Sequence, residues 1–278
     1  ELYSVTGGVP KYIELFSGGG DIYSAIRDNV LDRAGYLYDE PYFLLQKEVA
    51  EIGNYFSIIR AIAAGSSRLS AISGALEVKA TSLTKYLKTL IDLDILEREV
   101  PVTEKNPELC KRGLYRIKDN YIRFWFAFVY PYRGFLESGN EGVVMDRLRE
   151  GLIPRHTAFA FEEICRQRMW SLSAEGRWPF PFARVGRYWD ARTEIDIAAL
   201  DASGEQAVVG ECKYWKGPVG ANVLYGLEQK VRGAAWGKPP KKIWYVLFSI
   251  GGFSDDLKAL AGQRDDLLLI GENDLLPF

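Results

Sequence analysis

Three side chains on two neighbouring apolar segments have the types and spacing needed for metal-assisted chemistry. The stretch "TEIDIAALDASGEQAVVGECKYW", residues 193–215, holds two apolar runs joined by a polar turn, and it carries Asp196, Glu211 and Lys213. If the turn is centred on its Ser-Gly pair, Asp196 and Glu211 face each other across a β-hairpin. Lys213 shares the face of Glu211, because side chains alternate along a strand. The stretch therefore predicts two carboxylates and a lysine on one face.

Directly opposed residues of a hairpin have Cβ atoms only ~4.5 to 5.5 Å apart, so two carboxylates there repel each other and need a compensating charge. A divalent cation would supply it, because Mg²⁺ prefers oxygen ligands and needs only one or two carboxylates besides waters and phosphate. A lysine beside the cation could orient or deprotonate an attacking water and stabilise charge on a phosphate. This residue set predicts metal-assisted phosphodiester hydrolysis, with Mg²⁺ or Mn²⁺ as the cofactor.

The alternative interpretation is a solvated hairpin face without a catalytic role. Glu194 would then oppose Lys213 and form a weak surface ion pair with it. The apolar neighbours of the charged residues favour strands that lie in the middle of a sheet. Residue spacing alone leaves both interpretations open.

The C-terminal half of the chain alternates between helical and strand patterns, which predicts an α/β sheet covered by helices on both faces. The expected helices are 156–170, 220–236 and 254–263, and the expected strands are 193–201, 207–215, 241–250 and 266–271.

The region before it predicts three helices, over 47–65, 68–76 and 79–96, followed by a loose β-hairpin to about residue 118. This is the layout of a winged helix-turn-helix, in which the third helix enters the major groove of DNA. We expect Ser82, Lys85 and Lys88 on the exposed face of that helix. The alternative is that the module only packs against a neighbouring domain.

Composition limits the remaining possibilities. The 278 residues carry a formal net charge of −2, so DNA binding must depend on a local patch. Three scattered cysteines and a single histidine, His156, argue against a structural zinc site. No apolar run approaches the ~18 to 20 residues that span a bilayer. We expect a protein of the cytoplasm without a membrane partner, and the sequence leaves its oligomeric state open.

The aromatic stretch at 119–137 is expected to be buried.

The spacing of Asp196 and Glu211-Cys212-Lys213, after a helix with Glu162 and Glu163, resembles the PD-(D/E)XK nuclease superfamily, which has the restriction-endonuclease-like fold. The phrases "TEIDIAAL" and "VVGECKYW" resemble the C-terminal domain of an archaeal-type AAA ATPase family. "VTGGVPKYIELF", near the N-terminus, resembles the end of the ATPase lid in that family.

The resemblance implies a multidomain α + α/β fold. Residues 1–45 would be a remnant of an ATPase helical lid, 46–135 a winged helix-turn-helix domain, and 136–278 a restriction-endonuclease-like α/β domain. No Walker A motif occurs in the chain. If the chain is a fragment, ATP would be bound by a missing N-terminal ATPase domain, which would be a partner of this region. If it is complete, it would have no ATPase function.

The resemblance also assigns roles to residues. Asp196 and Glu211 would be metal ligands and Lys213 the catalytic lysine. The helix acid would be Glu162 or Glu163, and the Phe-Glu pattern favours Glu162. Gln229, on the following helix, ranks low as a further polar active-site residue.

The implied function is a metal-dependent DNA endonuclease with a winged-helix DNA-binding module. The alternative is a catalytically inactive region of the ATPase that binds DNA, regulates the enzyme or contacts another protein.

Overall fold

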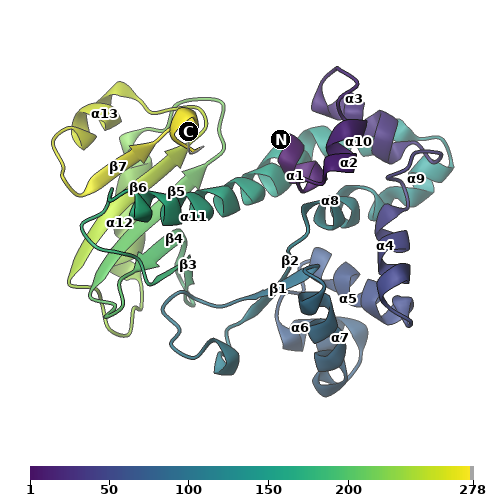
Figure 1. Cartoon of the computed structure of the whole chain (residues 1–278), viewed down its shortest axis with the longest axis horizontal. Coiled ribbons are helices and arrows are strands. Elements are labelled where there is room, and N and C mark those ends of the chain that lie inside the picture. Colours follow the sequence, from purple (N-terminus) through teal and green to yellow (C-terminus); the bar gives the residue numbers. More distant parts are fainter. Residues whose placement is uncertain (276–278) are drawn as a thin grey trace. The chain divides into compact units, whose positions relative to one another are not determined.

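The computed structural model describes residues 1–275, which form helices and two β-sheets in two compact units (Figure 1). The first unit comprises residues 1–99 and 112–157. The second comprises residues 100–111 and the chain from Ala158 onward. The expected domain boundaries near residues 45 and 135 stay predictions, because one compact unit can contain more than one domain.

The first unit is mainly helical. Its α-helices are α1 Leu2–Thr6, α2 Pro10–Leu15, α3 Ile22–Ile26, α4 Glu40–Glu48, α5 Ile52–Ala63, α6 Leu69–Leu76, α7 Ala80–Asp92, α8 Asn120–Phe128, α9 Arg133–Glu137 and α10 Glu141–Gly151. Shorter turns of other helix types are η1 Arg27–Leu31, η3 Tyr130–Tyr132 and η4 Leu152–Thr157. Strands β1 Leu96–Glu99 and β2 Leu114–Ile117 pair antiparallel.

The three helices and the hairpin expected from the sequence correspond to α5, α6, α7 and the pair β1–β2. On α7 the apolar side chains that recur every three or four residues, Leu83, Leu87 and Leu90, are buried. The first helix of the three starts later than predicted. Val49 has an extended backbone with φ −136° and ψ 140°, which separates α5 from α4.

The aromatic stretch forms part of the core of this unit, as expected. Phe124, Trp125 and Phe128 are buried on α8. The indole nitrogen of Trp125 donates a 2.6 Å hydrogen bond to the carbonyl of Tyr38, so the polar edge of this buried ring is satisfied.

The second unit contains a mixed five-stranded sheet in the order β3-β4-β5-β6-β7. Its strands are β3 Arg184–Trp189, β4 Glu194–Leu200, β5 Gln206–Lys213, β6 Lys242–Ser249 and β7 Leu267–Ile270, and its helices are α11 Ala158–Ala174, α12 Ala221–Gly233 and α13 Asp255–Ala261, with short turns η2 Pro107–Leu109 and η5 Glu272–Asp274. Strands β3 to β5 are antiparallel, and β5 to β7 are parallel.

Both faces of this sheet are covered, as expected. One face packs against α11, and the opposite face packs against α12 and α13. Figure 1 shows the strands side by side with these helices around them. Strand β3 was not expected, because two arginines interrupt its apolar pattern. One of them, Arg187, is buried and forms an ion pair with Glu194 on β4.

Residues 100–111 belong to the second unit. The backbone N–H of Val102 donates a 2.9 Å hydrogen bond to the carbonyl of Arg187, and Arg184 donates to the carbonyl of Val102 at 2.9 Å. The long connection between β1 and β2 is therefore held against β3 by one backbone hydrogen bond and by the guanidinium of Arg184.

From Ile197 to Leu200 the register of β4 and β5 agrees with the expected one. Ile195 was expected on the same face as Ile197 and packs on the opposite one, because a register shift interrupts β4 between them. Leu200 lies opposite Ala207, and Ile197 lies opposite Gly210. A Cβ atom at Gly210 would lie 2.6 Å from Cγ1 of Val246 and 3.0 Å from its carbonyl oxygen. Only glycine fits here, so β4, β5 and β6 come together closely just before the charged end of the hairpin.

Gly210→Ala should therefore lower the free energy of unfolding by about 1–3 kcal/mol, because the added methyl group overpacks the sheet. The matched control is Gly226→Ala on α12, where a Cβ meets no atom within 4 Å. That change should raise stability by about 0.5–1 kcal/mol, because alanine loses less conformational entropy in a helix. Urea unfolding followed by tryptophan fluorescence measures both, and equal stability of the two variants would contradict this account.

Candidate active site on the central strands

Asp196, Glu211 and Lys213 lie at the ends of the two central strands, where the hairpin pairing ceases. Alternation along β5 places Glu211 and Lys213 on the face that α12 covers, since Val209 of the same face packs there. On β4 a register shift interrupts the alternation between Ile195 and Ala198, which both pack on that face. The hydrogen bond from Cys212 and the charge of Glu211 place Asp196 beside the end of β5. The structure thus brings these three predicted site residues together at the same end of β4 and β5.

Glu211 is buried, with a relative exposure of 4%. Its carboxylate accepts hydrogen bonds from two ammonium groups. Lys213 donates to Oε2 at 2.7 Å, and Lys230 on α12 donates to Oε1. A buried carboxylate without such partners would be strongly destabilising, so these two ion pairs are what make the burial of Glu211 tolerable.

The Asp196 side chain bonds to the backbone of β5 just beyond the last backbone pair of β4 and β5. The last backbone pair of β4 and β5 is Ile197 with Gly210, and beyond it Oδ2 of Asp196 accepts a 3.0 Å hydrogen bond from the N–H of Cys212. Burial raises the pKa of Asp196, and the negative charge of Glu211 raises it further. The expected repulsion between the two carboxylates is therefore present.

The charges of the site are balanced by protein groups. Burial by itself would lower the pKa of Lys213, but the charge and hydrogen bond of Glu211 outweigh it and raise that pKa. Two carboxylates and two ammonium groups give a net charge of zero. From the sequence, a metal ion was expected to compensate the two carboxylates. In the structure Lys230 supplies a second positive charge beside that of Lys213.

Lys230 was missed by sequence reasoning, which considered its neighbour Gln229. Gln229 is exposed. The signal for Lys230 was its position three residues after buried Leu227 and one before buried Val231, beside the stripe of α12 that faces the sheet.

Ser249 is a second residue that the sequence analysis did not single out. It lies opposite Lys213 on β6 and is fully buried, and its hydroxyl has no hydrogen-bond partner within residues 1–275. Trp215, half exposed, adds an aromatic ring whose centroid is 5.7 Å from the Lys213 nitrogen.

Glu162 approaches from the opposite face of the sheet. Helix α11 packs there through Phe161 and Cys165, against a layer that includes Cys212. Burial raises the pKa of the Cys212 thiol first, and the neighbouring Cys165, Asp196 and Glu162 add to it, which locates the charge of Glu162 near β5. Glu162 also lies 3.7 Å from Nη1 of Arg166.

Glu194 does not form the surface ion pair expected in the alternative interpretation. Its carboxylate pairs with Arg187 on β3, and Lys213 pairs with Glu211 instead. The register change between β3 and β4 explains this, because Glu194 lies opposite Trp189 at the end of that strand pair.

The expected DNA-facing residues lie on the exposed side of α7. Ser82, Lys85 and Lys88 are all exposed, as predicted. The Ser82 hydroxyl donates a 2.7 Å hydrogen bond to the carbonyl of Lys79, so it also closes the first turn of the helix. The Lys85 nitrogen lies 5.9 Å from the ring centroid of Tyr86.

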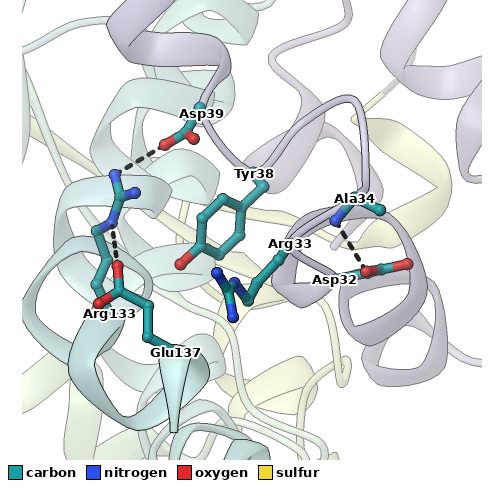
Figure 2. A pocket seen from close by; sticks show the side chains of 7 residues that line it. All are labelled: Asp32, Arg33, Ala34, Tyr38, Asp39, Arg133 and Glu137. Atoms are coloured by element: carbon teal, nitrogen blue, oxygen red, sulfur yellow. Dashed lines mark hydrogen bonds and ion pairs between the residues drawn. The ribbon is translucent and has the colours of Figure 1, made fainter. Parts of the chain in front are cut away.

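A hollow of about 470 Å³ in the first unit is a separate candidate site (Figure 2). Arg133 lies across it, 2.8 Å from Asp39 and 3.7 Å from Glu137, and its guanidinium sits 5.0 Å from the centroid of the Tyr38 ring. Its acidic and basic groups largely satisfy each other. We interpret it as a contact between the chain before α4 and helix α9.

Metal ligands other than the two carboxylates are scarce. Within residues 1–275, no group of three or more His, Cys, Asp or Glu side chains is placed to hold a metal ion. His156 is buried, and burial lowers its pKa to about 3, so it is a neutral core residue of the first unit. Among residues 1–275, no helix is long and apolar enough to cross a membrane.

Comparison with known proteins gives two similarities. A family model described as archaeal and bacterial proteins of unknown function matches residues 125–224. The chain is 32% identical over 216 residues to an uncharacterized protein of Methanocaldococcus jannaschii, a match that covers 78% of this chain and 47% of that protein. The chain thus spans about half the length of the curated relative. The segment matched by the family model includes Glu162, Asp196, Glu211 and Lys213, and it ends before Lys230.

The raised pKa of Asp196 predicts a pH-dependent gain in stability for Asp196→Asn. The folded protein holds the Asp196 proton more tightly than the unfolded chain, so wild-type stability is lost as pH rises from the ordinary value of 3.8 through the folded pKa. Asparagine still accepts from Cys212 and lacks the charge. The variant should be more stable than wild type by about 1 kcal/mol at neutral pH, and equally stable at pH 3.

Thermal unfolding at pH 3 and pH 7 measures the difference. The control is Asp255→Asn, whose fully exposed side chain should leave stability nearly unchanged at both values. A less stable Asp196→Asn protein at pH 7 would contradict the repulsion between Asp196 and Glu211.

Proposed function

We propose that the chain is the C-terminal region of an ATPase and acts as a metal-dependent DNA endonuclease, with a winged-helix module that positions DNA. The observation that carries the proposal is the convergence of Asp196, Glu211 and Lys213 at the same end of the neighbouring strands β4 and β5. Asp196 is half-buried beside the buried Glu211, and the repulsion between the two carboxylates lowers the stability of the sheet, which a catalytic role would explain.

The residues present fit a divalent cation. Asp196 and Glu211 would hold Mg²⁺ or Mn²⁺, since two carboxylates with waters and phosphate complete the shell of such an ion. When bound, the ion would lower the pKa of a bound water and polarise the phosphate. Lys213 would orient the attacking water and stabilise charge on the phosphate, and its hydrogen bond to Glu211 holds the ammonium group in place.

Glu162 would act as the helix acid of the PD-(D/E)XK pattern. Its position on α11, with its charge close enough to raise the pKa of Cys212 on β5, supports the choice of Glu162. It would contribute negative charge from the far face rather than a direct hydrogen bond to Asp196 or Glu211.

The winged helix-turn-helix is proposed from α5, α6, α7 and the hairpin β1–β2. The third helix of that layout would present Ser82, Lys85 and Lys88 to the DNA major groove and backbone. Exposure of all three side chains on α7 supports this role. The match covers 47% of the relative, which leaves room in that protein for a further domain, and we propose an N-terminal ATPase domain as the partner that binds ATP.

A second candidate function is a catalytically inactive region that binds DNA, regulates the ATPase or contacts another protein. The balanced charge of the site favours it, because Lys213 and Lys230 already satisfy both oxygens of Glu211 without a metal ion. The net charge of −2 agrees with modest DNA affinity.

Metal titration and plasmid nicking separate the two functions. Isothermal titration of Mn²⁺ and Mg²⁺ into the chain should show binding that Asp196→Asn abolishes, because the variant lacks one of two carboxylate ligands. Nicking of supercoiled plasmid with the same samples should disappear in parallel, by at least about 100-fold, as for loss of an essential catalytic group.

Asp255→Asn on α13 is the control and should keep both activities. Metal binding without nicking by the wild-type chain, on plasmid and branched DNA alike, would favour the inactive alternative. Absence of metal binding, even with DNA present, would remove the nuclease proposal.

The role of α7 is tested by charge reversal. Lys85→Glu together with Lys88→Glu should weaken duplex binding and reduce the slope of log affinity against log salt by about 2, since each lysine is expected to contact one phosphate. Fluorescence anisotropy at several salt concentrations measures this. The matched control is Arg147→Glu with Arg149→Glu on α10, two exposed arginines of the same unit. An unchanged slope in the α7 variant would count against DNA contact by this helix.

A further inference from the structure

The two lysines that satisfy Glu211 are attached to the fold in different ways. Lys213 is on the same strand, two residues from Glu211, and 23% of its side chain is exposed. Lys230 reaches the carboxylate from the last turn of α12, and 40% of its side chain is exposed. Lys230 can therefore move into water with little change in the protein, whereas Lys213 is confined beside the carboxylate it pairs with.

The atoms that a divalent cation needs are partly occupied. Oδ2 of Asp196 accepts the N–H of Cys212, whereas Oδ1 accepts no hydrogen bond from another group within residues 1–275. On Glu211, Oε2 is held by Lys213 and Oε1 by Lys230. A cation bound between Asp196 and Glu211 needs a Glu211 oxygen in its inner shell. An ammonium group on that oxygen would compete for the same lone pairs and repel the cation.

We propose that Lys230 is an exchangeable counter-ion of Glu211, which neutralises this carboxylate in the metal-free protein and is displaced when a divalent cation binds. The inference rests on the proposed metal site and adds its regulation. Lys213 stays in place in both states, and Lys230 sets how tightly the cation is held. The protein thereby keeps two adjacent carboxylates folded when no metal is present.

Isothermal titration of Mn²⁺ into the chain, without DNA, tests the proposal. Lys230→Met removes the competing charge and keeps the apolar stem, so Mn²⁺ affinity should rise. A roughly threefold to tenfold increase is expected, because one partly exposed ion pair no longer has to be broken when the cation binds. Lys230→Arg keeps a cation on Glu211 and should show no increase. The matched control is Lys238→Met, which breaks a comparable ion pair with Glu205 and should leave affinity unchanged.

Thermal unfolding gives a second measurement that does not depend on catalysis. Without metal, Lys230→Met should unfold at a lower temperature than wild type, because Glu211 loses one of its two cations. Saturating Mn²⁺ should raise the midpoint of the variant by more than that of wild type, since the metal replaces the missing charge. If the methionine variant fails to fold, Lys230→Gln, uncharged but able to donate a hydrogen bond, takes its place.

The outcomes distinguish this inference from the proposed function. Equal Mn²⁺ affinity in wild type and Lys230→Met, with binding lost in Asp196→Asn, overturns the role of Lys230 and leaves the metal site intact. Binding by Lys230→Met alone supports the role of Lys230 strongly. Binding by neither protein, or undiminished binding by Asp196→Asn, overturns both the inference and the metal site.

Discussion

Burial of the Glu211 carboxylate is the constraint around which the second unit is arranged. Removing a charge from water costs several kcal/mol, even after the surroundings relax, unless other charges and hydrogen bonds replace the lost solvation. Lys213 supplies one partner from the same strand and Lys230 supplies the other from α12. The position of α12 on the sheet is therefore tied to the chemistry of the strand ends as well as to the apolar contacts of Leu224 and Leu227.

The close approach of the strands places these charges. Gly210 lets β5 lie tightly between β4 and β6, and beyond the pair of Ile197 with Gly210 the Asp196 carboxylate accepts a hydrogen bond from the backbone of Cys212, next to Glu211. Cys212 points to the other face, where it meets α11. The same short stretch of β5 thus contributes a charged side chain to one layer of the fold and an apolar one to the other, and Glu162 acts on it from the second layer.

This balance of charge bears on both candidate functions. A set of two carboxylates and two lysines is stable without metal, so the site can persist in an inactive scaffold. It can also become a nuclease centre if one lysine is exchangeable, because a divalent cation then replaces an ammonium group and still compensates the two carboxylates. The similarity to archaeal and bacterial proteins of unknown function is compatible with either, and the first unit, with the exposed lysines of α7, would serve DNA positioning in both.

The sequence by itself determined the periodic features. Helical spacing located α7 and α12, alternation gave the faces of β4 and β5, and the polar turn set the pairing of Leu200 with Ala207, because each depends on residues close in the chain. Strand β3 was not predicted because Arg187 interrupts its apolar pattern, and the sequence does not show that Glu194 pairs with this arginine. Lys230 escaped because its partner is nineteen positions away, on another element. Only the tertiary structure decided which charges neutralise one another, since ion pairing depends on distance in space and on the water that packing removes.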